Sequence, residues 1–192
     1  MWYAIQKEPG KEEMTGQQFG NFGSVLTQLD GEWRELFCVK KKRYQGQWHD
    51  ERDRFLPEYV FFITRALSRG NRIPYLENAD SSECCGISGQ TDEFCPVKRE
   101  EEELLIKLTG GKDEVDMSYG VIRDDILSIY KGPLTGLESR VKKIDRHKRK
   151  GIISMNLLGK EYLAEVGLEI TEKTYSYQNM LNGFGKAAGC GM

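Results

Sequence analysis

Short β-strand segments separated by glycines occupy the last third of the chain and restrict its fold more than any other feature. Strands this short, divided by turn residues at regular spacing, are typical of a small antiparallel barrel. Val141 and Ile144 are three positions apart instead of two, which predicts a bulge in the second segment. The segments lie at 126–130, 138–145, 152–158 and 162–166.

The first half of the chain has a different pattern, in which strand segments are mixed with helical ones. Residues 56–64 form a continuous apolar run that is typical of a central strand. A helix is expected from Pro96, which suits a first helical position, to the stop at Gly110-Gly111. Apolar residues at helical spacing, interrupted by glycines, indicate a weaker helix over 14–29. Further strands are expected at 2–6 and 35–41, the latter leading to a turn at Gln45-Gly46.

These patterns predict an α+β protein of two domains. The first would be an antiparallel-sheet α/β sandwich and the second a small five-stranded β-barrel, joined by a polar, glycine-led linker. We expect the sandwich over 1–109, the linker over 110–118, the barrel over 119–173 and a disordered tail over 174–192.

Composition places the chain among ordinary soluble proteins, with 39% hydrophobic and 30% charged residues. No run approaches the roughly 20 apolar residues of a membrane span, and the N-terminus lacks a secretory leader. We therefore expect a cytoplasmic protein that makes no membrane contact. Residues 1–118 carry 16 basic and 22 acidic side chains, and residues 119–172 carry 10 and 8. Any contact with nucleic acid should therefore be local.

Neither the cysteines nor the histidines form a recognisable chemical motif. The five cysteines are odd in number and irregularly spaced, which argues against a disulfide framework. Cys84, Cys85 and Cys95 could ligate zinc, but their spacing differs from that of paired structural sites, and free thiols are expected. A thiol dyad of Cys85 or Cys95 with His49 stays an unsupported alternative. We expect no enzyme, no cofactor and no metal.

Two basic segments are candidates for contact with a polyanion. The first, at a predicted hairpin tip, consists of Arg146, His147, Lys148, Arg149 and Lys150. The second consists of Lys40, Lys41, Lys42 and Arg43, with Tyr44 and Trp48 nearby. Basic and aromatic side chains together suit single-stranded or hairpin nucleic acid. A solvated loop is the alternative in both cases, and the acids at 50, 51 and 53 favour it for the second.

The apolar strand and the acidic helix start each allow two interpretations. Tyr59 and Phe61 point to one face of their strand and Val60 and Phe62 to the other, so one pair could form an exposed docking patch. Pattern alone does not say which face is buried. Four successive glutamates at 100–103 diverge around a helix, so a helix-start charge run is favoured over a metal site.

Several stretches resemble the NusG family of transcription elongation factors. "WYAIQ" followed by "GKEE" resembles the start of the family's N-terminal (NGN) domain, and "LPEYVFF" is similar to its "FPGYVFV" strand. "GPLTGLESRVKKID" is similar to the KOW motif, and "NLLGKEYLAEVGLEI" to the closing barrel strands. "IDRHKRKG" and the residues after it look most like the specialised LoaP paralogs. Glu58 replaces the usual glycine, and residues 157–160 replace the family's "IFGR" tip.

The resemblance implies a function without catalysis. The NGN-like domain would dock on the clamp coiled coil of RNA polymerase through Pro57, Tyr59 and Phe61. The KOW barrel would bind a nascent RNA hairpin through the basic residues, as in processive antitermination. Lys7 and Lys11 would lie near upstream DNA. In a general NusG-type factor the barrel tip, Leu157 and Leu158, would instead bind a small-subunit ribosomal protein or a termination factor. A free-standing KOW RNA-binding protein is the third possibility.

Overall fold

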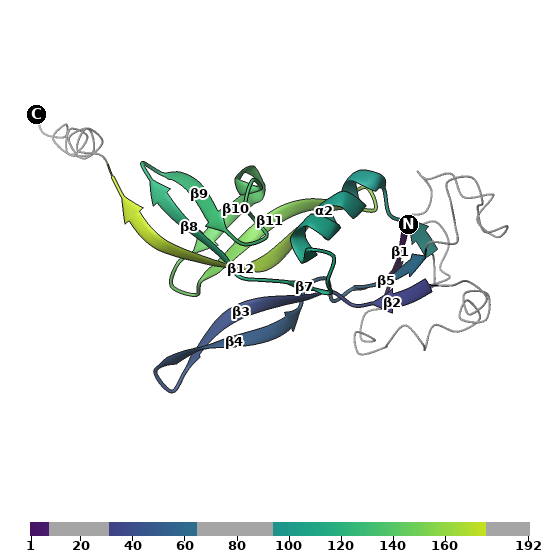
Figure 1. Ribbon diagram of the computed structural model, residues 1–192, viewed down its shortest axis with the longest axis horizontal. Coiled ribbons are helices and arrows are strands. Elements are labelled where there is room, and N and C mark those ends of the chain that lie inside the picture. Colours follow the sequence, from purple (N-terminus) through teal and green to yellow (C-terminus); the bar gives the residue numbers. More distant parts are fainter. Residues whose placement is uncertain (8–30, 65–93, 176–192) are drawn as a thin grey trace, which may run out of the picture.

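The computed structural model describes residues 1–7, 31–64 and 94–175 (Figure 1). Within these ranges the fold is rich in β-structure, with three sheets and one α-helix, which is compatible with an α+β protein. The helix expected over 14–29 and the tail beyond residue 175 lie outside the described residues. In the same ranges no helix has the length and apolar character needed to cross a membrane.

A four-stranded antiparallel sheet lies at the N-terminal end of the molecule (Figure 1). Its strands, in the order β2-β5-β1-β6, are β2 Gly31–Arg34, β5 Tyr59–Thr64, β1 Trp2–Gln6 and β6 Phe94–Pro96. The strands expected near residues 2–6 and 56–64 are confirmed. β5 lies inside the sheet because its apolar side chains can be covered on both faces.

A long hairpin, β3 Phe37–Tyr44 and β4 Gln47–Arg54, extends from this sheet toward the other end of the molecule (Figure 1). Its turn has positive φ at both central residues, 53° at Gln45 and 80° at Gly46. Such a turn matches the right-handed twist of the paired strands. The turn expected at these two residues is confirmed.

The helix α2, Arg99–Thr109, begins later than its sequence indicates. Pro96 was expected at its first position, but this residue ends β6, where it pairs with Tyr3. Lys98 is the N-cap, and its backbone N–H donates to the Glu101 carboxylate at 3.1 Å. Sheet pairing thus overrides the helix preference at Pro96, whereas the predicted stop holds because Gly110 adopts φ 61°.

A five-stranded sheet in the order β10-β11-β12-β8-β9 forms the C-terminal part. The predicted bulge is confirmed by a register shift between Val141 and Lys143. β12 is far longer than the expected strand over 162–166, because its second half pairs in parallel with β8. The strands are β8 Ser118–Arg123, β9 Ile126–Lys131, β10 Val141–Asp145, β11 Lys150–Leu157 and β12 Lys160–Thr174.

A side chain links the edge strand β9 to the turn that precedes β10. Between β9 and β10 the chain forms a 3-10 turn, Glu138–Arg140. The backbone N–H of Ile129 on β9 donates to the Glu138 carboxylate at 3.2 Å. Hydrogen bonds from backbone N–H groups hold the pKa of Glu138 below its ordinary value. The charged form of Glu138 is therefore the one that joins β9 to this turn.

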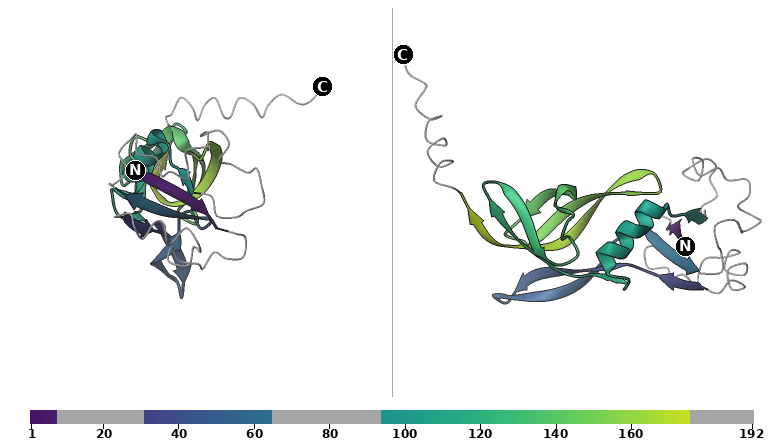
Figure 2. Two further views of the ribbon diagram at one scale, coloured as in Figure 1. Left: turned by 90° about the vertical axis from the view of Figure 1, so that its right-hand side faces the viewer. Right: turned by 45° about the horizontal axis from the view of Figure 1, so that its top comes forward.

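The two parts of the protein share one hydrophobic core. Buried residues from Trp2 to Leu168 form a single cluster, and the β3–β4 hairpin lies along β12 (Figure 2). Residues 110–118, expected to be a linker, contain strand β7 Glu114–Val115, which pairs in parallel with β3. Val115 and Ser118 are fully buried. This segment is therefore part of the packed structure.

Candidate nucleic-acid interface

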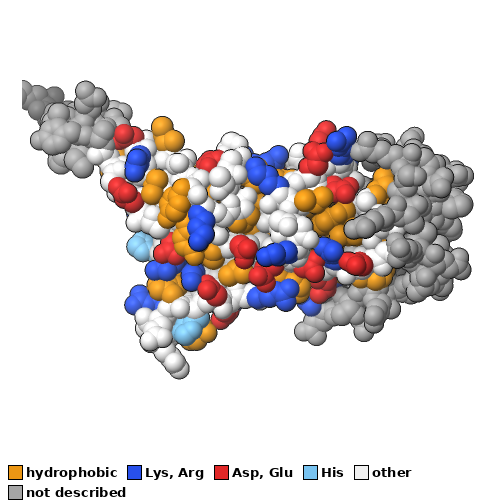
Figure 3. All heavy atoms as spheres, in the orientation of Figure 1, with side chains coloured by type: hydrophobic (Ala, Val, Ile, Leu, Met, Phe, Trp, Pro, Cys, Tyr) orange, Lys and Arg blue, Asp and Glu red, His pale blue; other side chains and the backbone are white. Residues whose placement is uncertain are grey.

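The fold brings the two predicted basic segments together. The β10–β11 turn, residues 146–149, lies beside the β3–β4 hairpin, because the Arg149 guanidinium lies over the Trp48 ring, 4.2 Å from its centroid. Both histidines lie at this end of the molecule, among Lys, Arg and acidic side chains (Figure 3). About a hundred residues separate the two segments in the chain. We call this surface the basic end.

The β10–β11 turn displays to solvent three of the five residues of the predicted basic segment 146–150. The Asp145 carboxylate accepts the Lys148 backbone N–H at 2.9 Å, and Arg149 adopts φ 53°. Arg146, His147 and Lys148 are exposed. Within the described part of the chain, no ion pair holds Arg146 or Lys148. Their charges are therefore available to a ligand.

Arg149 and Lys150 have structural partners instead. Arg149 pairs with Glu169 at 3.1 Å, in addition to its contact with Trp48. Lys150 pairs with Glu165 at 2.9 Å. The five-residue basic run therefore divides into an exposed part, 146–148, and a part that positions the turn on β12.

Neighbouring acids neutralise most of the basic hairpin. Lys41 pairs with Asp50 at 2.7 Å, and Lys42 pairs with Glu51 and Asp53. Hydrogen bonds to Asp50 and to Glu51, respectively, raise the pKa of Lys41 and of Lys42 above the ordinary value of lysine. The prediction that acids neutralise this hairpin is therefore correct for both lysines.

Arg43 and two aromatic residues complete the basic end. Arg43 is exposed and forms no ion pair with any described residue. It pairs directly with Trp48 across the hairpin, so both side chains lie on one face of the ribbon. On the other face Tyr44, 47% exposed, stacks on His49 with ring centroids 3.9 Å apart.

Lys40 and Glu165 link the hairpin to the C-terminal sheet. The buried Lys40 ammonium lies 3.0 Å from Glu165 and 3.6 Å from Asp53. Burial acts to raise the pKa of Glu165, but hydrogen bonds from Lys150 and Lys40 outweigh it and hold the pKa below its ordinary value. Lys40 is thus a structural residue and cannot contact a ligand without breaking this link.

The residues expected to dock on RNA polymerase are buried. Tyr59 is 6% exposed and Phe61 is inaccessible, and Val60 and Phe62 on the other face are buried too. The Tyr59 ring meets Tyr162 of β12 with centroids 6.1 Å apart, edge to face. The expectation of an exposed patch is therefore corrected: the C-terminal sheet and the core cover this face. Pro57 remains half-exposed.

The predicted barrel tip is also packed against the N-terminal part. Leu157 is 1% exposed, and Leu158 is half-buried with φ 52°. The next backbone N–H, of Gly159, donates to the buried Glu101 carboxylate of α2 at 3.2 Å. The expected partner-binding tip is thus held on α2, which corrects the expectation that these leucines are free.

Among the residues that the structure describes, the remaining sequence candidates do not assemble a chemical site. Lys7 is buried and pairs with Glu35, so it does not face a DNA ligand, and Lys11 lies outside the described residues. Cys38 is a buried free thiol and Cys95 is buried too, and burial raises the pKa of Cys38 to about 11. The described residues hold no cluster suited to a metal, and Cys84 and Cys85 are not among them.

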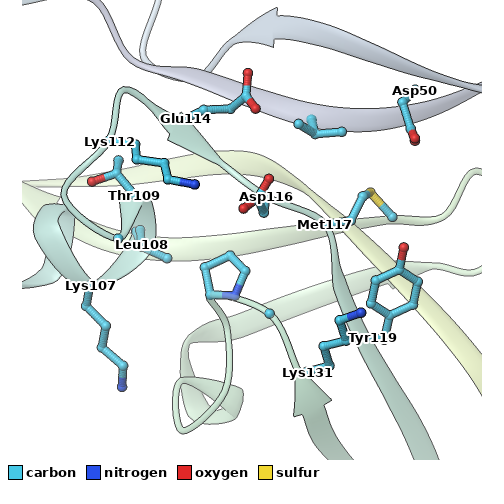
Figure 4. A pocket seen from close by; sticks show the side chains of 14 residues that line it. Asp50, Lys107, Leu108, Thr109, Lys112, Glu114, Asp116, Met117, Tyr119 and Lys131 are labelled. Carbon is cyan, nitrogen blue, oxygen red and sulfur yellow. The ribbon is translucent and has the colours of Figure 1, made fainter.

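A cleft of about 620 Å³ lies between α2, β8 and the hairpin (Figure 4). Three lysines and three acids line it, and Glu114 among the acids pairs with Arg52 at 2.7 Å. Lys107 extends away from Lys112, so the lysines do not converge (Figure 4). Because basic and acidic side chains line the cleft in equal number, its charge favours neither an anionic nor a cationic ligand. The charged residues are Lys107, Lys112, Lys131, Asp50, Glu114 and Asp116.

Sequence reasoning missed Glu101, Tyr162 and Glu165, which hold the two parts together. Glu101 was considered only as one of four helix-start glutamates, and because the N-cap residue is Lys98 and not Ser or Thr, the local sequence carries no capping-box signature for it. Nothing in the local sequence distinguishes Glu165. Comparison with protein-family models and with characterised proteins found no match to the chain.

Proposed function

We propose that this protein is a NusG-like, LoaP-type processive antitermination factor that binds RNA through its basic end and RNA polymerase through its N-terminal part. The observation that carries the proposal is a set of three exposed cations, Arg43 on the hairpin and Arg146 and Lys148 on the turn that the Arg149–Trp48 contact holds beside it, none of which forms an ion pair with a described residue. Arginine forks suit phosphates and guanine edges. Cationic side chains left without acids suit a polyanionic ligand.

The arrangement of the family-like stretches supports the same proposal. "WYAIQ" forms β1 and "YVFF" lies in β5, and the two strands pair antiparallel. The KOW-like stretch supplies the turn before β10 and the bulged strand itself. The factor would act by binding alone, shifting polymerase away from paused and terminating states. Its N-terminal part and its C-terminal sheet would correspond to NGN and KOW domains.

Docking through Tyr59 and Phe61 requires a change of conformation. Because both residues are buried, the C-terminal sheet must move away before a polymerase helix can reach them. The half-exposed Pro57 lies at the start of this face and is accessible without that movement. Docking on polymerase through Tyr59 would therefore begin with separation of the Tyr59 and Tyr162 rings.

The test is transcription by purified bacterial RNA polymerase across a terminator placed downstream of a leader RNA hairpin. The intact protein should raise read-through, and the double variant Arg146→Glu/Lys148→Glu should not. Arg99→Glu, which reverses an exposed charge on α2, is the matched control and should act like the intact protein. Unchanged read-through with the intact protein, together with no capture of polymerase, would overturn the proposal.

A free-standing RNA-binding protein is the second candidate, because most of the residues expected to contact protein partners are buried. Tyr59, Phe61 and Leu157 are all covered, whereas the basic end is open. Affinity capture with and without nuclease separates the two candidates. Polymerase that stays bound after nuclease treatment supports the antitermination factor, and RNA captured without polymerase supports the second candidate.

A further inference from the structure

The basic end depends on contacts between the two parts of the protein. Trp48, the cross-strand partner of Arg43, carries the Arg149 guanidinium on its ring. Arg149 is fixed in turn by Glu169 of β12. A continuous set of contacts thus runs from the hairpin, through Trp48, to the turn that displays Arg146 and Lys148.

Neither basic segment supplies many available charges alone. On the hairpin, Lys40, Lys41 and Lys42 are all paired with acids, which leaves Arg43 as the one cation there without an ion pair among the described residues. The turn adds Arg146 and Lys148. Affinity for nucleic acid grows with the number of phosphates neutralised, so one cation contributes little. The two segments together make a surface that neither makes separately.

The packing of β3 on β12 sets this arrangement. The Gly167 backbone forms a hydrogen bond with Cys38, which lowers the pKa of that thiol against the larger effect of burial. A Cβ at Gly167 would overlap the Met117 sulfur and the Val39 carbonyl oxygen. Lys40 and Glu165 join the same strands at 3.0 Å. The two segments therefore stay together only while these strands remain in contact.

We infer that one RNA segment with unpaired bases binds across both parts, and that this bipartite site exists only while β3 is packed on β12. This inference rests on the RNA-binding role proposed above. Arg43, Arg146 and Lys148 contact phosphates, and the RNA passes around the hairpin tip to the opposite face of the ribbon, where the exposed Tyr44 ring, backed by His49, stacks on an unpaired base. A hairpin loop offers phosphates and unstacked bases together.

The packed state that forms this site is also the one that buries Tyr59 and Phe61. RNA bound across both parts stabilises the packed state by mass action. RNA binding and docking through Tyr59 therefore oppose one another, since each requires a different arrangement of the C-terminal sheet. The RNA would be held across both parts before docking and by the turn alone afterwards.

The experiment measures fluorescence anisotropy of an RNA hairpin with a degenerate single-stranded loop, using the full chain at a series of salt concentrations that starts at low salt. Arg43→Glu and Arg146→Glu should each weaken binding about tenfold and lower the slope of log affinity against log salt by about one. The control Arg99→Glu should stay within about twofold of the intact protein. Wild-type affinity in Arg43→Glu, with loss in Arg146→Glu, would overturn the bipartite site.

A substitution outside the basic end tests the need for packing. Gly167→Ala should move β3 off β12 and reduce affinity about as much as Arg43→Glu, although no cation is changed. Circular dichroism checks that the variant folds. If it does not, Glu165→Gln, which removes the link to Lys40, should give a smaller loss of the same sign. Full RNA affinity in a folded Gly167→Ala variant would contradict the inference.

The outcomes separate this inference from the proposed function. Absence of RNA binding by the intact protein overturns both. RNA binding with the expected variant pattern, but no polymerase capture, supports the bipartite site and overturns the antitermination proposal. Equal affinity for a DNA hairpin of the same loop sequence overturns the assignment of RNA as the ligand.

Discussion

The predicted binding residues differ in their exposure to solvent between the two ends of the interface that joins the N-terminal and C-terminal parts. At one end the apolar candidates Tyr59, Phe61 and Leu157 are buried within the protein itself. At the other end the cations Arg146 and Lys148 stay exposed. Burial of apolar surface is favourable whatever covers it, whereas burial of an unpaired charge is costly. An apolar motif in the sequence can therefore belong either to the core or to a docking surface. A charged residue that the fold leaves exposed and unpaired is a better indication of a ligand site.

The largest expected effect is at the apolar end. Phe61→Ala should lower the free energy of unfolding by about 3–5 kcal/mol, because it removes a fully buried ring that contacts Trp2 edge to face. Urea denaturation followed by tryptophan fluorescence measures it. A loss below about 1 kcal/mol would mean that Phe61 is not part of the core.

The same burial affects how polymerase-binding variants are interpreted. Tyr59→Ala would also remove a buried side chain, so a loss of polymerase binding could reflect unfolding. Tyr162→Ala removes the ring on the other side of this contact and leaves the docking residue intact. Polymerase binding by this variant therefore reports the effect of uncovering Tyr59, whereas binding by Tyr59→Ala reports the effect of removing it.

The next effect concerns the attachment of the barrel tip to α2. Glu101→Ala should cost about 1–3 kcal/mol, because the N–H groups of Lys98 and Gly159 both lose their acceptor. Glu100→Ala, one residue away and exposed, is the matched control and should change stability by about 0.5 kcal/mol or less. Thermal unfolding of the two variants in parallel gives the comparison, and equal losses would exclude a special role for Glu101.

Features that depend on local sequence were predictable. The strands near residues 2–6 and 56–64, the turn at Gln45-Gly46, the bulge after Val141 and the helix stop at Gly110 follow from apolar runs, spacing or glycine. The helix start and the length of β12 were not, because Pro96 and the second half of β12 pair with strands distant in sequence. Packing of the segment 110–118 also depends on a distant strand, β3.

The sequence was sufficient to predict which basic residues belong to the candidate site. It was not sufficient to predict which of them are left without an ion pair and can contact a ligand. Both basic segments were identified, but their acids come from different distances in the chain. Asp50, opposite Lys41 in the hairpin, is close enough to be anticipated. Glu165 and Glu169, which pair with Lys150 and Arg149, lie on another strand, so their effect follows from the fold alone.

A smaller effect links pH to the contact between the hairpin and the C-terminal sheet. The folded pKa of Glu165 is lowered, so its stabilising contribution is complete above its unfolded pKa of about 4.5 and is lost as pH falls through the folded value. Since this carboxylate is partly exposed, the contribution is at most about 1 kcal/mol. Unfolding free energies at about pH 6 and pH 3 should differ less in Glu165→Gln than in the intact protein. An identical difference in both would exclude this role.

The smallest expected effect distinguishes two arginines of the same turn. Arg149→Ala should lose about 0.5–1 kcal/mol of stability, because Arg149 lies over Trp48 and pairs with Glu169. Arg146→Ala should change stability by less than about 0.5 kcal/mol, since no ion pair holds Arg146 within the described residues. A double-mutant cycle with Trp48→Ala measures the coupling directly. Coupling to Arg149 but not to Arg146 would show that the turn contains one cation that positions it and another that is available to a ligand, whereas equal coupling would contradict that division.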